Sequence, residues 1–188
     1  MRLYLIRHPR PLIAAGVCYG QLDIAAENPT FAAAALRPQV PAGLPLWSSP
    51  LRRCRDLAQA LAAAAGGTAG EEAPLRLDSR LAEIDFGAWE GRPWDAIPRD
   101  QIDAWAADVG GYAPPGGESP WQLQARVLDF FNTLPDRDTV VVTHAGVIRS
   151  LLAADQGLPP ERWCDLACDY ASLTVWQRTP DGDAGAAQ

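Results

Sequence analysis

The chain has 188 residues, of which 48% are hydrophobic and 21% are charged. This length suits one globular domain, and the composition excludes a disordered, collagen-like or coiled-coil protein. The net charge of −7 argues against binding to nucleic acid or to a membrane surface through bulk charge, so we expect neither as a partner.

All 16 basic residues are arginines, because the chain contains no lysine. This excludes P-loop NTPases, Schiff-base enzymes and kinases, whose chemistry depends on a lysine. The four cysteines, at 18, 54, 164 and 168, follow no disulfide or CxxC spacing, so we expect reduced, buried thiols. No apolar run approaches the roughly 20 residues of a membrane span, and the first run is too short for a signal peptide. We therefore expect a cytoplasmic protein.

The first half of the chain alternates between predicted strands and helices. Apolar runs at 2–7 and 44–49 are typical of short buried strands. From Leu51 onward, apolar residues recur with helical spacing, and the glycine pair at 66–67 provides a stop. Residues 75–78 are predicted to form a further short strand.

The second half continues this alternation. Residues 139–143 are a run of β-branched residues without polar alternation, which indicates a parallel strand buried on both faces. The other predicted elements are a helix over 95–108 with Trp105 facing inward, a helix opened by Glu118 and Ser119 that buries Leu123, Val127, Phe130, Phe131 and Leu134, a helix over 147–154, and a strand over 172–178. This order predicts an α/β fold with a mainly parallel sheet, in a single domain over 1–180 with a frayed tail over 181–188.

The only two histidines, His8 and His144, each follow a predicted buried strand. Loops beyond the carboxyl ends of parallel strands converge on the binding crevice of such folds, so both imidazoles occupy positions where sites form. Arg7 shares its strand end with His8 and can offer positive charge to an anion. Three more arginines within 52–55 begin the next helix; either an anionic ligand or a solvated basic turn explains them.

Several carboxyl groups are candidates for proton transfer. Glu83 lies among apolar, aromatic and glycine residues in the loop-rich segment 81–94. A carboxyl group beside apolar walls tends to have a raised pKa and can act as a general acid or base. Asp85, Glu90 and Glu118 compete for that role, and ion pairing would explain each acid equally well. Their positions in the sequence do not show which of these four acids transfers the proton.

Five segments occur in a fixed order along the chain: LIRH at 5–8, SSPLRRCRDLA at 48–58, LAEIDFGAWEG at 81–91, PGGES at 115–119 and VVTHAGVIR at 141–149. Together they resemble the motifs of the histidine phosphatase superfamily, also called phosphoglycerate mutase-like. The resemblance covers nearly the whole chain and implies that family's three-layer α/β/α sandwich. Within the superfamily, GVCYGQLD at 16–23 and the short chain are most similar to the alpha-ribazole phosphatases of cobalamin biosynthesis.

The resemblance implies roles for five residues. His8 matches the nucleophile that becomes phosphohistidine, Arg7 and Arg53 match phosphate clamps, Glu83 matches the proton donor, and His144 matches the second pocket histidine. It further implies a phosphomonoester hydrolase without metal or cofactor. The implied substrate is a small-molecule phosphate ester, alpha-ribazole 5′-phosphate in the first place. Neutral His8 would attack in line while the arginines and His144 hold the phosphate oxygens.

The first loop departs from the family pattern. Pro9, Arg10 and Pro11 replace the usual Gly-Glu-Thr, and residues 12–16 contain no counterpart of an asparagine that often contacts phosphate. Which group replaces that asparagine is therefore open. Four tryptophans are candidates for stacking a flat substrate, although aromatic residues more often pack in the core, namely Trp89, Trp94, Trp105 and Trp121.

Other classes fit the sequence less well. A cysteine phosphatase needs an arginine six residues after its cysteine, and none of the four cysteines has one. A haloacid-dehalogenase-type phosphatase uses an Asp-x-Asp loop that follows a buried strand. Residues 136–138 form such a triplet but precede the strand, so we interpret them as a turn. A metallophosphatase centre usually gathers several histidines with aspartates, and this chain has only two histidines. The alternatives left open are a broad-specificity phosphomonoesterase, a mutase-type enzyme and an inactive phosphate-binding module. The sequence does not indicate the oligomeric state.

Overall fold

The computed structural model describes residues 1–64 and 74–178, and within these ranges five strands form one sheet. The strands are β1 (Arg2–Arg7), β2 (Leu46–Ser48), β3 (Arg76–Leu77), β4 (Thr139–Thr143) and β5 (Leu173–Gln177). Their spatial order is β3-β2-β4-β1-β5, with β1 to β4 parallel and β5 antiparallel to β1. The predicted α/β fold with a mainly parallel sheet is confirmed.

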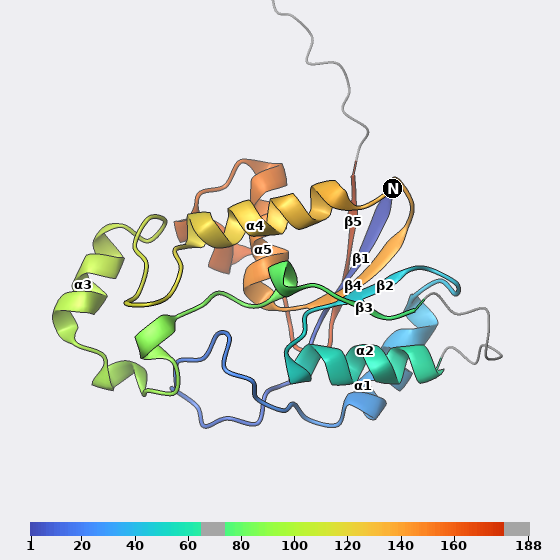
Figure 1. Cartoon of the computed structure of the whole chain (residues 1–188), viewed down its shortest axis with the longest axis horizontal. Helices are drawn as coiled ribbons and strands as arrows, with labels where there is room; N and C mark the ends of the chain where they lie inside the picture. The colour runs from blue at the N-terminus through green and yellow to red at the C-terminus, as the bar shows by residue number, and fades with distance from the viewer. Residues whose placement is uncertain (65–73, 179–188) are drawn as a thin grey trace, which may run out of the picture.

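Helices cover both faces of this sheet. The helices are α1 (Pro29–Leu36), α2 (Arg52–Ala64), α3 (Arg99–Ala107), α4 (Pro120–Thr133) and α5 (Ala145–Gln156), with short 3-10 turns η1 (Arg37–Gln39), η2 (Ser79–Leu81), η3 (Gly87–Trp89), η4 (Trp94–Ala96) and η5 (Pro160–Asp165). Helices α4 and α5 lie on one side, α1 and α2 lie on the other, and α3 stands beyond the sheet (Figure 1). This arrangement is the predicted three-layer sandwich.

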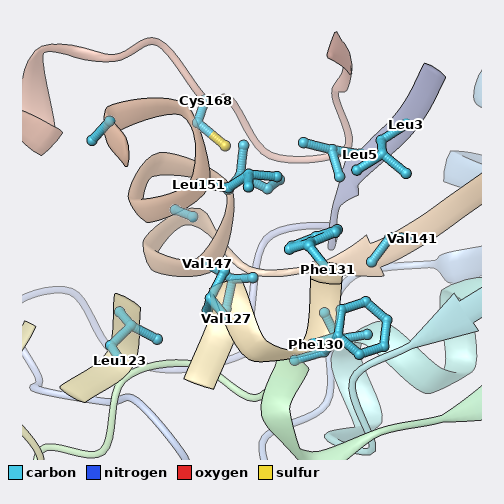
Figure 2. Close-up of a cluster of buried hydrophobic side chains, with 14 of the residues drawn as sticks. Leu3, Leu5, Leu123, Val127, Phe130, Phe131, Val141, Val147, Leu151 and Cys168 are labelled. Atoms are coloured by element: carbon cyan, nitrogen blue, oxygen red, sulfur yellow. The ribbon is translucent and has the colours of Figure 1, made fainter. Parts of the chain in front are cut away.

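Alternation along β1 divides the core between the two faces. Leu3 and Leu5 pack with α4 and α5, whereas Tyr4 and Ile6 pack with α1 and α2. Figure 2 shows the first of these clusters, where Phe130 of α4 lies beside the strands. Burying each such leucine contributes about 1.5–3 kcal/mol. The sheet is therefore anchored on both sides, which makes its strand ends a rigid platform.

Two helices differ from their predictions. Helix α1 was not predicted, because its alanine-rich sequence has no amphipathic pattern; Asn28 caps it, accepting the Phe31 N–H, and Pro29 begins it. Helix α3 begins at Arg99, not at 95, because Pro98 forces the residue before it into an extended conformation. Helix α5 begins two residues earlier than predicted, directly after His144. The glycine stop at 66–67 and the tail at 181–188 lie outside the described residues.

A third, smaller core lies beneath α3. Trp89 is fully buried there, with Cys18 and Ile97, and Trp105 packs inward against it as predicted. All four cysteines are free, but Cys164 is exposed, so the prediction of buried thiols is wrong for that residue; it lies in the short turn η5 at the surface. Among the described helices, none is both long and apolar enough to cross a bilayer.

Candidate active site

The two histidines meet because β1 and β4 are neighbouring parallel strands that end in register. Arg7 is paired with Thr143, and each histidine is the next residue of its strand. The His8 N–H continues the ladder by donating to the Thr143 carbonyl (3.1 Å). The ring centroids of His8 and His144 are 5.1 Å apart, and the rings meet edge to face. Both imidazoles therefore belong to a single site at the carboxyl edge of the sheet.

The hydrogen bond to Pro9 determines which nitrogen of His8 is free. His8 Nδ1 lies 2.6 Å from the Pro9 carbonyl oxygen, and a carbonyl only accepts, so Nδ1 carries the proton. Nε2 then keeps its lone pair. Burial, aided by the positive charge of Arg53, lowers the pKa of His8 to about 3. His8 is consequently a neutral base with one unprotonated nitrogen.

His144 is held in the opposite tautomer. Arg53 donates its Nε–H to His144 Nδ1 (3.2 Å), so His144 Nε2 carries the proton and donates to Ser49 Oγ (2.8 Å). Burial and the charge of Arg53 lower the pKa of His144 well below its usual value. Both nitrogens are thus engaged with protein groups. In this arrangement His144 orients Arg53 and does not present a free N–H to a phosphate.

Two arginines bring positive charge to the histidine pair. Arg53, in the first turn of α2, is fully buried, and it also donates to the carbonyl oxygens of Gly20 (2.5 Å) and Leu22 (2.8 Å). Three of its five N–H groups are used in this way, so two are free for an anion. Arg7 donates to the Cys168 carbonyl (2.5 Å).

The other two arginines at the start of α2 do not join the site. Arg52 is exposed, and Arg55 pairs with Asp56. Only Arg53 points inward, because its position on α2 faces the sheet. The structure therefore separates one buried arginine from a solvated basic turn, two interpretations that the sequence left open.

Glu83 lies against the first turn of α5. Its Oε2 accepts the Gly146 N–H (3.3 Å), and its Oε1 accepts the N–H of Ile84 (3.1 Å). The N–H groups in the first turn of a helix have no partner within the helix, so the Gly146 N–H is available to hold this carboxyl group in place. Gly146 is two residues from His144, so Glu83 lies at the same edge of the sheet as the histidine pair. The five residues that the sequence singled out are thus gathered around the ends of β1, β4 and the loops after β2 and β3.

The competing acids serve other contacts. Asp85 accepts the Gly87 N–H, Glu118 pairs with Arg126 (2.5 Å), and Glu90 accepts three backbone N–H groups.

Within residues 1–64 and 74–178, no three His, Cys, Asp or Glu side chains gather as metal ligands would. The Asp-x-Asp triplet lies before β4, where Asp138 pairs with Arg2 at the opposite end of the sheet, as expected for a turn.

Two tyrosines, Tyr19 and Tyr170, line the histidine site; Tyr19 belongs to the run GVCYGQLD, and neither was predicted as a site residue. Their hydroxyl oxygens are 2.9 Å apart; the Tyr170 ring lies 5.8 Å from the His8 ring, and the Arg53 guanidinium lies 5.6 Å from the Tyr19 ring. Both tyrosines are partly exposed, whereas His8 is only 1% exposed. The His8 imidazole is therefore covered by its neighbours, whereas the two tyrosines reach the surface.

Three of the four tryptophans considered as stacking surfaces, Trp89, Trp94 and Trp105, pack in the core beneath α3 instead. Trp89 donates its indole N–H to Gln101 (2.6 Å), and Trp94 stacks on Trp105 in the core beneath α3. Trp121 is half exposed and packs edge-on against Trp163. The histidine rings contact each other and, for His8, the Tyr170 ring, and not these four tryptophans. Their clustering follows from the need of a long irregular segment for its own apolar core.

A model of the family described as histidine phosphatase superfamily (branch 1) matches residues 3–185. The chain belongs to this superfamily. Its sequence is 34% identical, over 209 residues, to glucosyl-3-phosphoglycerate phosphatase of Mycolicibacterium vanbaalenii, covering 98% of this chain and 88% of that relative.

Solved structures of the superfamily have the same fold. A mycobacterial glucosyl-3-phosphoglycerate phosphatase superposes with a TM-score of 0.75 and 32% identity, over 93% of this chain and 88% of the other. The alpha-ribazole phosphatase of Shigella flexneri superposes with a TM-score of 0.77 over 93% and 89% of the two chains. At 24% identity, this second likeness shows the fold alone. The chain belongs to the histidine phosphatase superfamily, and these relatives are phosphatases. We therefore conclude that the chain is a phosphatase.

Proposed function

We propose that this histidine phosphatase hydrolyses phosphate monoesters through a phosphohistidine on His8 Nε2. The observation that carries the proposal is the buried, neutral imidazole whose Nδ1–H is held by Pro9, which leaves a lone pair on Nε2 beside Arg53. That lone pair attacks phosphorus, the ester P–O bond breaks, and the carboxyl group of Glu83 protonates the departing alkoxide. Water then attacks phosphorus, Glu83 takes its proton, and the N–P bond breaks to release phosphate.

The arginines stabilise the charge of the phosphoryl group in both steps. Arg53 has two free N–H groups and is already oriented by His144, so it needs no reorganisation when the transition state forms. Arg7 adds a second guanidinium from the end of β1. No step requires a metal, and we expect activity to survive chelation with EDTA.

For the substrate, two candidates have different support. Relatives that dephosphorylate glucosyl-3-phosphoglycerate are 34% identical over nearly the whole chain, which favours an acidic phosphate ester. Arg10 supports this choice: its guanidinium lies 5.1 Å from the Tyr170 ring, which lies beside His8, and its ion pair with Glu27 is long (3.9 Å) and solvent-exposed, with side chains 65% and 58% exposed. This arginine can receive the carboxylate of a phosphoglycerate. Alpha-ribazole 5′-phosphate is supported by the run GVCYGQLD and by a shared fold.

The test is a comparison of kcat/KM for glucosyl-3-phosphoglycerate, 3-phosphoglycerate, glycerol 3-phosphate, phosphoserine and alpha-ribazole 5′-phosphate. We expect the phosphoglycerate esters to lead, and R10Q to reduce their advantage over glycerol 3-phosphate by about tenfold, the usual value of a charged hydrogen bond. The exposed arginine at position 52 is the control, and R52Q should leave the ratio unchanged. Equal turnover of all five esters would overturn the substrate assignment.

The nucleophile is tested separately. Brief exposure to a ³²P-labelled ester should place acid-labile label on the parent enzyme and none on H8N, which should also lose turnover. Parental activity in H8N, or EDTA inhibition that Mg²⁺ reverses, would overturn the proposed mechanism.

A further inference from the structure

Glu90 is a partly buried acid that the proposed reaction does not use. It follows the turn η3, and its carboxylate accepts three backbone N–H groups: Gln21 (2.7 Å) and Phe86 (3.1 Å) on Oε1, and Leu22 (2.5 Å) on Oε2. Three donors converging on one carboxylate are a strong arrangement, because hydrogen bonds to an ionised acceptor are about twice as strong as neutral ones. Two of these donors come from a segment 69 residues away along the chain. Glu90 therefore fixes the backbone of residues 21 and 22.

The same short segment is what holds Arg53. The Gly20 carbonyl and the Gln21 N–H belong to one peptide group, and in a planar trans peptide these two groups point in opposite directions. One side of this peptide donates to Glu90, and the other side accepts from Arg53 Nη2 (2.5 Å). Leu22 also bonds to both side chains, through its N–H to Glu90 and through its carbonyl to Arg53 Nη1 (2.8 Å), although these two groups belong to successive peptides. The carboxylate and the guanidinium thus face each other across the backbone.

Hydrogen bonds in such a chain strengthen one another. A carboxylate that accepts the N–H polarises the peptide and makes its carbonyl oxygen a better acceptor. Gly20 lets the backbone approach this closely: a Cβ there would lie 1.9 Å from the Ile84 carbonyl oxygen and 2.9 Å from Glu90 Oε1. Backbone pairing of Cys18 with residues 91–92 holds the segment from its other end. Residues 20–22, which lie outside α2, therefore hold the Arg53 guanidinium in its position.

We propose that Glu90 is a positioning residue for the reaction, acting on the phosphoryl group through residues 20–22 and Arg53. The inference rests on the proposed function, because Arg53 is the group that contacts phosphate there. Glu90 keeps two of the guanidinium N–H groups on backbone carbonyls, which aims the free ones at the oxygens next to His8. A misplacement of about 1 Å at such a group can lower the rate on the order of a hundredfold.

The experiment measures kcat, KM and the inhibition constant of orthovanadate for the parent, E90Q, R53A and the double variant. E90Q has the same size but turns an N–H donor toward the backbone donors. We expect it to lower kcat about 10-fold to 100-fold, to weaken vanadate by a similar factor and to leave KM less affected. In the R53A background, E90Q should reduce kcat by less than about twofold, because the group through which it acts is gone.

Controls separate positioning from loss of fold. E161Q removes an exposed acid in η5 and should match the parent. E90D, which keeps the charge, should recover part of the lost kcat. In the parent itself, amide exchange at Gln21 and Leu22 should be as slow as in β1, which tests the contact without any variant.

Three outcomes would contradict the proposal: equal factors for E90Q with and without Arg53, unchanged kcat and vanadate inhibition in E90Q, or rapid exchange of both amides. If R53A and H8N kept parental activity, the proposed function itself would fail. By contrast, if R53A inactivates the enzyme but E90Q keeps parental activity, the proposed function stands and only the positioning role of Glu90 fails.

Discussion

At the scale of single residues, the chemistry depends on two imidazoles that differ in which nitrogen carries the proton. Pro9 accepts from His8 Nδ1, whereas Arg53 donates to His144 Nδ1. Both rings are buried beside arginine, which keeps both neutral. We predict that ¹⁵N-histidine NMR of the free enzyme shows an Nδ1–H tautomer for one ring and an Nε2–H tautomer for the other, with no titration between pH 5 and 8.

The chain has only these two histidines, so the spectrum needs no selective labelling. S49A removes the acceptor of the His144 Nε2–H and should disturb that tautomer alone. A midpoint near 6.5 for either ring, or the same tautomer for both, would contradict the description of the site.

At the scale of elements, the first turn of α5 and the loop after η2 fit closely. A Cβ on Gly146 would lie 2.2 Å from Glu83 Oε1, and the flexible carboxylate is the group that can move. We predict that G146A lowers kcat about a hundredfold, the usual contribution of a general acid. Its free energy of unfolding should not fall, because alanine favours a helix by up to about 1 kcal/mol over glycine.

Gly157 at the other end of α5 is the matched control. It is left-handed (φ 64°) with open space around its Cα, so G157A should cost about 1 kcal/mol in urea unfolding and leave kcat unchanged. If G146A kept parental kcat, Glu83 would not be the proton donor.

Elements also differ in how well the sequence predicts them. Helix α4 has a clear periodic pattern of buried residues, and strand β4 is a run of β-branched residues that is buried throughout, so both could be predicted. Helix α1 could not be found in this way, because alanines carry little hydrophobic contrast and its cap is local. The start of α3 at Arg99 is a local effect of Pro98, because a proline disfavours the helical conformation of the residue before it.

At the scale of the whole molecule, burying two neutral imidazoles couples stability to pH. Burial lowers the pKa of both histidines, so below about pH 6.5 the unfolded chain binds protons that the folded chain does not. The free energy of unfolding should therefore fall as pH falls, with a slope that approaches about 2.7 kcal/mol per pH unit once both histidines are protonated in the unfolded chain but not in the folded one. For His8 this loss continues down toward pH 3.

Urea unfolding at pH 7, 6 and 5 checks this slope. H8N removes one of the two groups and should roughly halve it between pH 6 and 5. A stability that is constant from pH 7 to 5 would contradict the burial of neutral histidines.

The sequence by itself determined the α/β fold, the placement of both histidines at strand ends, and the family. Each of these depends on local periodicity, or on motifs that occupy few positions. The tertiary structure decided which nitrogen of each imidazole is free, why Arg53 and not Arg55 enters the site, and what Glu90 holds. These are matters of hydrogen-bond partners on segments far apart in the chain, and a partner is defined only when packing brings two atoms to about 3 Å.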